Sequence, residues 1–218
     1  MVAKVLQRDQ VDASELTILS GSSLFCERDD RILFKDLNFS IREGEVFQIK
    51  GSNGSGKTTL LRIICGLNDS YEGVVSWYGE PIEEKAEEYY NALTYIGHRI
   101  GVNKVLSPVE NLRWSCGLQQ SISYKEIYDA LAKMDLKGFE ESQCFTLSAG
   151  QQKRVALSKL LISQARLWVL DEPFTALDYK GVEQLEALVR QHADRGGSVL
   201  ITTHHSLSVS GLQVLELG

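Results

Sequence analysis

The sequence predicts an α/β fold in which a parallel sheet follows an antiparallel β part and is interrupted by a helical insertion. Two short apolar runs, 167–170 and 199–202, flank an amphipathic helical pattern at 181–192. Strand–helix–strand order at this spacing implies right-handed crossovers and parallel strands. A third apolar run, 46–50, leads directly into a glycine-rich loop that is followed by a helical pattern.

The N-terminal part has the alternating pattern of half-buried β-strands. Residues 15–24 alternate weakly, residues 32–42 place apolar side chains at alternate positions, and residues 73–78 form a further short strand. Residues 1–14 are polar and charged and lack the apolar stretch of a secretory signal. We therefore expect a short mobile extension over residues 1–14 and a single domain over residues 15–218.

Helical patterns dominate the middle of the chain. Residues 125–134 and 151–161 each place apolar side chains three and four positions apart, on one face of a helix. We expect a helical insertion over approximately residues 89–163. The strand pattern then returns at 167–170, and the last strand is expected at 213–217.

Composition argues against several classes of protein. Lys and Arg total 23 against 29 Asp and Glu, and the resulting net charge of -6 disfavours a large nucleic-acid surface, so we expect no nucleic-acid partner. No stretch approaches the roughly 18 apolar residues of a membrane span. The cysteines are far apart, which favours reduced thiols in a cytosolic fold over disulfides or a zinc site; they are Cys26, Cys65, Cys116 and Cys144.

Residues 51–58, GSNGSGKT, match the phosphate-loop pattern G-x-x-x-x-G-K-[ST] between an apolar strand and a helix. Such a loop points successive backbone N–H groups at phosphate oxygens, and the following helix turns its positive end towards them. Lys57 is placed to reach the β- and γ-phosphates, and the Thr58 hydroxyl is placed to bind Mg²⁺. We expect phosphate contacts from Gly51, Ser52, Asn53, Gly54, Ser55, Gly56, Lys57, Thr58 and Thr59. The loop predicts binding of a nucleoside triphosphate and leaves open what the energy drives.

Two carboxylates, Asp171 and Glu172, end the apolar strand at 167–170. Side chains alternate along a strand, so the two point in different directions. We expect Asp171 to hold the Mg²⁺ together with Thr58, and Glu172 to polarise the attacking water as a general base.

A further set of motifs follows in a fixed order. Residues 147–152, LSAGQQ, lie just before a helix for which Ser148 is a plausible N-cap, and residues 176–178, ALD, come shortly after the acid pair. His204 then follows the strand at 199–202. Phosphate loop, L-S-x-G-Q, D-E-P, A-L-D and a histidine after a strand together resemble the ATP-binding cassette (ABC) ATPases over roughly residues 15–218.

That resemblance implies an ATPase with a P-loop NTPase core of the ABC type, active as a head-to-tail dimer of two copies with two ATP molecules at the interface. Each ATP would contact the phosphate loop of one copy and the signature segment of the other. His204 would contact the γ-phosphate and the water near Glu172, and Asp178 would lie at the dimer contact. The signature segment consists of Ser148, Ala149, Gly150 and Gln151.

The sequence departs from the common ABC pattern at two positions. His98 stands where most members have glutamine, at the hinge to the helical insertion, and its imidazole should add a pH dependence to ATPase activity between about pH 6 and 7. Ala149 stands where glycine is commoner, which a negative φ would allow. The residue that stacks on adenine stays open between Arg28, reached by ungapped counting, and the nearby Phe25.

Within the family, residues 95–112, the LSAGQ segment and DEPFTALD at 171–178 are similar to the ATPase subunits of haem exporters in cytochrome c maturation. This implies a peripheral protein on the cytoplasmic face of the inner membrane that powers haem export or release of a haem chaperone. Its partners would be an integral permease of the exporter-protein B type and haem-handling proteins of the C type. Two alternatives are an ATPase subunit of a transporter for another substrate and, less favoured, a soluble ABC-type ATPase of repair or translation.

Overall fold

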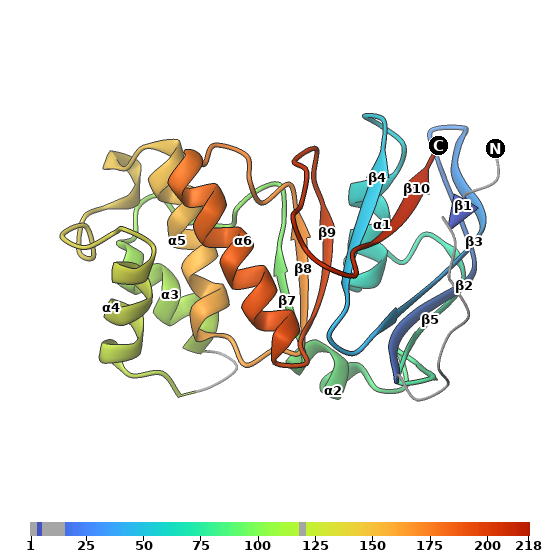
Figure 1. The fold of residues 1–218 in the computed structure, drawn as a ribbon, viewed down its shortest axis with the longest axis horizontal. Coiled ribbons are helices and arrows are strands. Elements are labelled where there is room, and N and C mark those ends of the chain that lie inside the picture. The colour runs from blue at the N-terminus through green and yellow to red at the C-terminus, as the bar shows by residue number, and fades with distance from the viewer. Residues whose placement is uncertain (1–3, 6–15, 118–120) are drawn as a thin grey trace.

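Two β-sheets with a helix enclosed between them form one half of the protein in Figure 1, and a group of helices forms the other. The structure is a computed structural model that describes residues 4–5, 16–117 and 121–218. The six-stranded sheet has the order β1-β10-β4-β9-β8-β7, and all its neighbouring pairs except β1–β10 are parallel. Its strands are β1 (Lys4–Val5), β4 (Val46–Gly51), β7 (Leu93–Ile96), β8 (Leu167–Asp171), β9 (Ser198–Thr202) and β10 (Gln213–Leu217).

The second sheet is antiparallel and has four strands in the order β3-β2-β5-β6. They are β2 (Thr17–Arg28), β3 (Arg31–Arg42), β5 (Glu72–Trp77) and β6 (Glu80–Pro81). Helix α1 (Lys57–Ile64) is buried in the same apolar cluster as side chains of both sheets. The helix that begins at the phosphate loop is therefore held on both sides by the core.

Both faces of the parallel sheet are covered. On β8, Leu167 and Val169 belong to the cluster around α1, whereas Trp168 and Leu170 belong to a second cluster with α5 (Ala149–Ile162) and α6 (Tyr179–Asp194). This burial on two faces explains why the strand is continuously apolar. The α/β prediction, with an antiparallel β part and parallel strands, is confirmed.

The helical part consists of α3 (Pro108–Gly117), α4 (Tyr124–Lys133) and α5, which pack on one another. Within the range 89–163 expected for the insertion, Leu93–Ile96 is instead a strand of the parallel sheet, paired with β8, and α2 (Ala86–Asn91) ends before it. The helices of the insertion thus begin only at Pro108. A 3-10 turn, Cys144–Thr146, precedes α5.

Most of the extension expected over residues 1–14 lies outside the described residues. Two of its residues, Lys4 and Val5, pair with Glu216 and Leu215 of the last strand. Among the described residues, no helix combines the length and the apolar character that crossing a membrane requires.

Candidate functional site

The phosphate loop joins β4 to α1, as predicted. Gly56 precedes the helix with a φ of 99°, and a Cβ at this position would lie 3.1 Å from the Cβ of Leu33, so both conformation and space favour glycine. The Lys57 ammonium folds back over the loop and donates to the carbonyl oxygens of Gly51 and Ser52, at 2.8 and 3.0 Å. Its charge is thereby held directly beside the cavity that the loop borders.

A cavity of about 520 Å³ lies against this loop. It brings together most of the phosphate-loop residues with the acid pair, His98 and Arg28, and its wall also contains Asp29, Arg31 and Leu33. The lining loop residues are Asn53, Gly54, Gly56, Lys57, Thr58 and Thr59. Three cations (Arg28, Arg31, Lys57) therefore face a space large enough for a nucleotide, as binding of an anionic phosphate chain requires.

Asp171 is the most enclosed charge at the site, with 1% of its surface exposed. The Thr58 hydroxyl donates to its Oδ2 at 2.9 Å, and the Thr202 hydroxyl donates to its Oδ1 at 2.6 Å. A threonine hydroxyl and a carboxylate oxygen at this spacing are hard oxygen donors of the kind that Mg²⁺ prefers. The residues present thus fit a Mg²⁺ ion, and Thr58 and Asp171 as its ligands stay a prediction.

Glu172 follows with a left-handed backbone, φ 47°, which is strained for a residue with a Cβ. Its N–H donates to the carbonyl and hydroxyl oxygens of Thr202, at 3.0 and 3.1 Å, and its carbonyl accepts from the Lys153 ammonium at 3.1 Å. Its Oε1 lies 3.6 Å from Nε2 of His204. Hydrogen bonds therefore fix both the backbone N–H and the backbone carbonyl of Glu172, and its side chain lies beside the exposed imidazole of His204.

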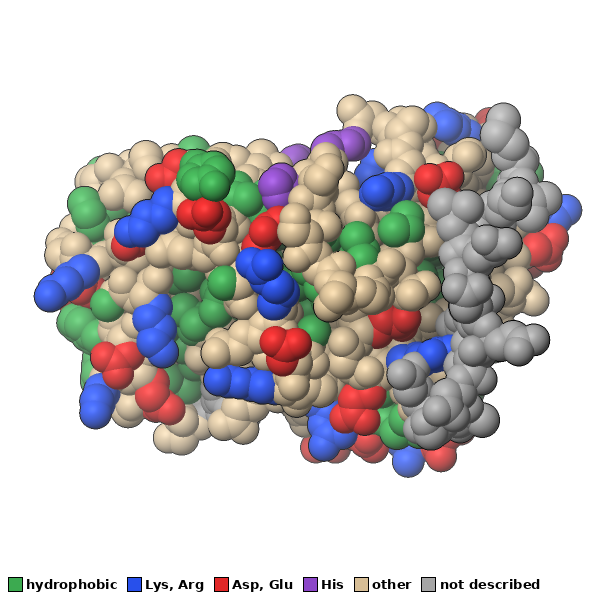
Figure 2. Space-filling model, viewed as in Figure 1, with side chains coloured by type: hydrophobic (Ala, Val, Ile, Leu, Met, Phe, Trp, Pro, Cys, Tyr) green, Lys and Arg blue, Asp and Glu red, His purple; other side chains and the backbone are tan. Residues whose placement is uncertain are grey.

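Lys153 is a buried lysine on α5, the helix that begins at the signature segment. Burial lowers its pKa below the ordinary value, and the nearby Asp171 and Glu172 oppose that shift. The side chain thus connects the start of α5 with the acid pair. In Figure 2, histidine side chains gather at the upper edge of the visible face, beside acidic side chains.

The signature segment begins α5. Ser148 and Gln151 form a reciprocal capping box, in which each side chain accepts from the other residue's backbone N–H. A Cβ on Gly150 would lie 2.9 Å from the carbonyl oxygen of Ala176, so only glycine fits there without movement. Ala149 is in the first turn of α5 and its φ is negative, so the backbone there accommodates its methyl group.

The structure does not bring the signature segment into the phosphate-loop cavity of the same chain. Ser148, Ala149, Gly150 and Gln151 are absent from its lining, and so is Asp178. Ser148 and Ala149 are exposed on the surface instead.

Asp178 caps the next helix. Its Oδ1 accepts from the Gly181 N–H at 2.9 Å and from Nη2 of Arg154 at 2.6 Å. Both bonds lower the pKa of Asp178, and the bond from the Gly181 N–H has the larger effect. Arg154 also pairs with Asp135 at 3.2 Å, so the start of α6 is tied to α5 and to the end of α4.

The cavity lining distinguishes the two candidates for the adenine contact. Arg28 is part of the cavity wall and pairs with Asp29 at 3.4 Å, whereas Phe25 is absent from the lining. Arg28 as the stacking residue stays a prediction, which this placement favours.

Sequence reasoning missed five residues that hold or line the site, namely Thr202, Lys153, Asp29, Arg31 and Leu33. Thr202 had a signal in the sequence, because it ends an apolar strand, and sites in open α/β sheets lie at the carboxyl ends of the strands. Lys153 had none, because a lysine on an amphipathic helix is usually exposed.

Comparison with known proteins identifies the family of the chain. The family model for ABC transporters matches residues 34–175. The cytochrome c biogenesis ATP-binding export protein CcmA of Hahella chejuensis is 48% identical over 202 residues, covering 92% of this chain and 96% of the relative. The CcmA protein of Vibrio parahaemolyticus is 47% identical over 204 residues, covering 92% of this chain and all of the relative.

Solved structures share the fold. An ABC transporter ATP-binding protein from Pyrococcus furiosus superposes with a TM-score of 0.79 at 25% identity, covering 91% of this chain and 96% of that one. A dimeric ATP-binding cassette bound to ADP and phosphate superposes with a TM-score of 0.75 at 24% identity, covering 86% and 88%. The chain therefore belongs to the ABC transporter ATP-binding family and, within it, to the CcmA proteins of cytochrome c biogenesis.

Proposed function

We propose that this ATPase subunit powers haem export, or release of a haem chaperone, in cytochrome c biogenesis. The observation that carries its ATPase chemistry is a single cavity that joins the phosphate loop, the Thr58–Asp171 pair and Glu172. The pathway follows from the export proteins of cytochrome c biogenesis that it resembles over 92% of its length.

In this proposal Glu172 accepts a proton from the attacking water while the water oxygen bonds to the γ-phosphorus. The bond from that phosphorus to the β,γ-bridging oxygen breaks, and ADP leaves with the electron pair. Lys57 neutralises the phosphate charge, and His204 holds the γ-phosphate and the water near Glu172. Thr58 and Asp171 would hold Mg²⁺, which would supply further neutralisation of the phosphate charge.

A second copy of the chain completes each site in this proposal. All four signature residues lie outside their own chain's cavity, and Ser148 and Ala149 are exposed, as a part that acts on a partner's nucleotide must be. Two-fold pairing would place Ser148 and Gly150 of each copy at the other's γ-phosphate, with Asp178 at the contact. ATP binding then closes the dimer, since both halves contribute only when closed, and hydrolysis reopens it.

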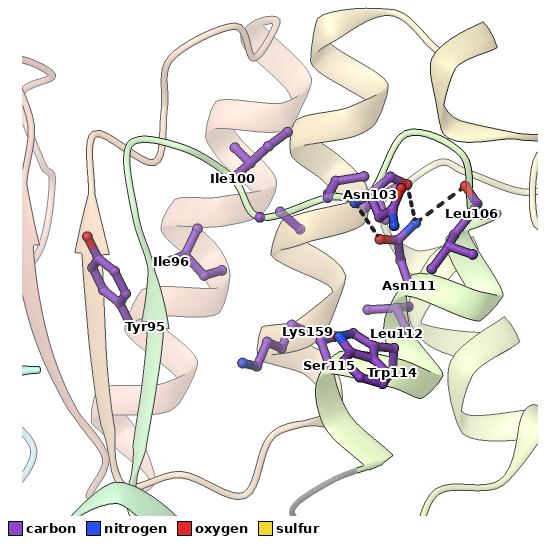
Figure 3. A pocket seen from close by; sticks show the side chains of 14 residues that line it. Tyr95, Ile96, Ile100, Asn103, Leu106, Asn111, Leu112, Trp114, Ser115 and Lys159 are labelled. Carbon is purple, nitrogen blue, oxygen red and sulfur yellow. Dashed lines mark hydrogen bonds between the residues drawn. The ribbon is translucent and has the colours of Figure 1, made fainter. Parts of the chain in front are cut away.

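A groove between β7 and the helical part is the proposed seat of the membrane permease. Figure 3 shows its lining, with Asn111 of α3 bonded to the backbone of Asn103 and Lys159 extending from α5. The groove measures about 500 Å³, and the apolar side chain of Trp114 in its wall is 69% exposed. Val105, the neighbour in sequence of the lining residue Leu106, is 67% exposed. An integral permease of the B type would dock here, with C-type haem-handling proteins in the same assembly. That docking would hold the subunit on the cytoplasmic face of the inner membrane.

The competing functions make different predictions. An ATPase subunit for another transported substrate would have the same cavity and the same groove but a different permease. A soluble ATPase of repair or translation would need a nucleic-acid surface, which the net charge of -6 disfavours.

Affinity capture tests the proposal. Tagged Glu172→Gln protein is recovered with ATP from detergent-solubilised membranes, and bound proteins are identified by mass spectrometry. A haem-exporter permease with haem-handling partners would support the pathway, and a different permease would overturn it while leaving the ATPase chemistry intact. Glu172→Gln with Trp114→Glu is the matched control, because it should lose the permease and keep the ATP-dependent dimer.

A further inference from the structure

His205, the neighbour of His204, contacts three elements of the protein at once. Its Nε2 lies 2.9 Å from Oε1 of Glu186 on α6, and its backbone N–H donates to the Thr203 hydroxyl at 2.9 Å. Its ring packs against Phe174 with a centroid separation of 4.8 Å. The imidazole is therefore fixed by its edge, its face and its backbone.

The bond to Glu186 is directional. The Glu186 side chain is largely buried, with 13% exposed, and Nη2 of Arg190 is 3.9 Å away, too far for a hydrogen bond. A carboxylate accepts only, so Nε2 of His205 carries the proton and donates it. Among the described side chains, His205 is thus the donor that lies within hydrogen-bond distance of the largely buried Glu186 carboxylate.

The ring contact leads back to the acid pair. Phe174 is two residues after Glu172, in the turn that follows β8, and His204 lies 3.6 Å from Glu172. Glu172 is therefore two residues from Phe174 in the chain, and His204 is one residue from His205, so the ring contact joins the two segments that carry the Glu172–His204 pair. Glu186 anchors this unit to α6, a 16-residue helix that packs on the sheet.

We propose that His205 is a positioning residue for ATP hydrolysis, which clamps the segment after β9 to α6 and to Phe174 and so fixes His204 relative to Glu172. The inference rests on the proposed function, in which His204 holds the γ-phosphate and the water. Misplacing a reacting group by about 1 Å costs on the order of 100-fold in rate. His205 itself touches neither the cavity wall nor Glu172 among the described contacts.

Two variants separate the edge of the ring from its face. His205→Phe keeps a ring against Phe174 and removes the donor to Glu186, whereas His205→Gln keeps a donor and removes the ring. We expect His205→Phe to lower kcat for ATP about 10- to 100-fold with KM changed less than about twofold. His205→Gln should retain most of the kcat that His205→Phe loses, because its amide N–H can still donate to Glu186.

His192 supplies the matched control. Its ring also stacks on an aromatic residue, Trp168 at 3.8 Å, and its Nε2 lies 3.3 Å from the backbone oxygen of Arg166, but these contacts are at the start of β8, whereas Glu172 follows the end of that strand. His192→Phe should leave kcat unchanged even where it lowers the melting temperature. Equal losses of kcat in His192→Phe and His205→Phe would overturn the clamp, since general destabilisation would then explain both.

The decisive measurement combines His205→Phe with His204→Ala. A residue that acts through His204 has nothing left to position once that imidazole is gone, so the double variant should have the kcat of His204→Ala alone. The same fold-loss in both backgrounds would overturn the clamp. If His204→Ala itself leaves kcat unchanged, the proposed role of His204 fails first and the clamp fails with it. If His204→Ala is impaired and His205→Phe is not, the clamp alone fails.

Discussion

Thr202 bonds to both members of the acid pair, and replacing it with valine tests whether that arrangement matters. Its hydroxyl donates to Asp171 at 2.6 Å and accepts from the Glu172 N–H at 3.1 Å, and its side chain is fully buried. Valine has nearly the same shape but offers neither bond. Asp171 would then keep the Thr58 hydroxyl as its remaining side-chain partner.

The expected cost follows from the charge on the partner. A hydrogen bond to a charged group contributes about 2 kcal/mol, and for a chain of this length about 1 kcal/mol shifts the melting temperature by roughly 2–4 °C. Thr202→Val should therefore melt about 4–8 °C lower. We also expect kcat to fall at least about tenfold and the Mg²⁺ concentration for half-maximal activity to rise, because the Asp171 carboxylate is no longer held in its rotamer.

Thr94→Val is the matched control for this experiment. Thr94 is also a buried strand threonine of the same sheet, but its hydroxyl pairs with the neutral Ser163 hydroxyl at 2.6 Å, away from the cavity. It should melt about 2–4 °C lower with kcat unchanged. Thr202→Ser, which keeps the hydroxyl, should retain activity. Equal stability losses in the two valine variants, together with normal kcat and Mg²⁺ dependence in Thr202→Val, would refute the reasoning.

Three further results are expected. Glu172→Gln should form a dimer with excess ATP and Mg²⁺, and light scattering that detects only monomer would contradict the closed-dimer mechanism. Tyr89→Phe should lower the free energy of unfolding by about 1–2 kcal/mol in urea titrations, because its buried hydroxyl donates to the Ile64 carbonyl at 2.7 Å. Burial lowers the pKa of Lys153 in the folded protein below 10.5. Between that lowered value and pH 10.5 the unfolded chain binds one proton more than the folded protein, so the free energy of unfolding rises with pH. Lys153→Met should remove this rise, measured by urea titrations from about pH 8 to 10.5.

Sequence motifs predicted the parts of the site that are contiguous in the chain. The phosphate loop and the acid pair each depend on a few neighbouring residues after one strand, and the structure places both in one cavity wall. Thr202 and Lys153 lie 30 and 19 positions from Glu172, and their contacts depend on the register that pairs Asp171 with Thr202 and on how α5 packs. Neither the register nor the packing is visible as a local pattern.

Register shifts in one strand and the shortness of another explain why the adenine contact stayed open and why the range expected for the insertion was too long. Strand β2 shifts register between Leu24 and Cys26 and again between Cys26 and Glu27, so counting positions could not decide between Arg28 and Phe25. Strand β7 has only four residues and follows a helical turn at once, which hid it inside the range expected for the helical insertion. Short elements of this kind are fixed by their partners in the sheet rather than by their own sequence.

The bond from Lys153 to the Glu172 carbonyl has a consequence for timing. In the proposed two-fold assembly, α5 of one copy begins at one nucleotide, while Glu172 of the same copy faces the other nucleotide. The 3.1 Å bond between them would therefore make each pocket sense the occupancy of its twin. The two hydrolysis events would then not be independent, and the permease would receive two coupled strokes rather than two unrelated ones.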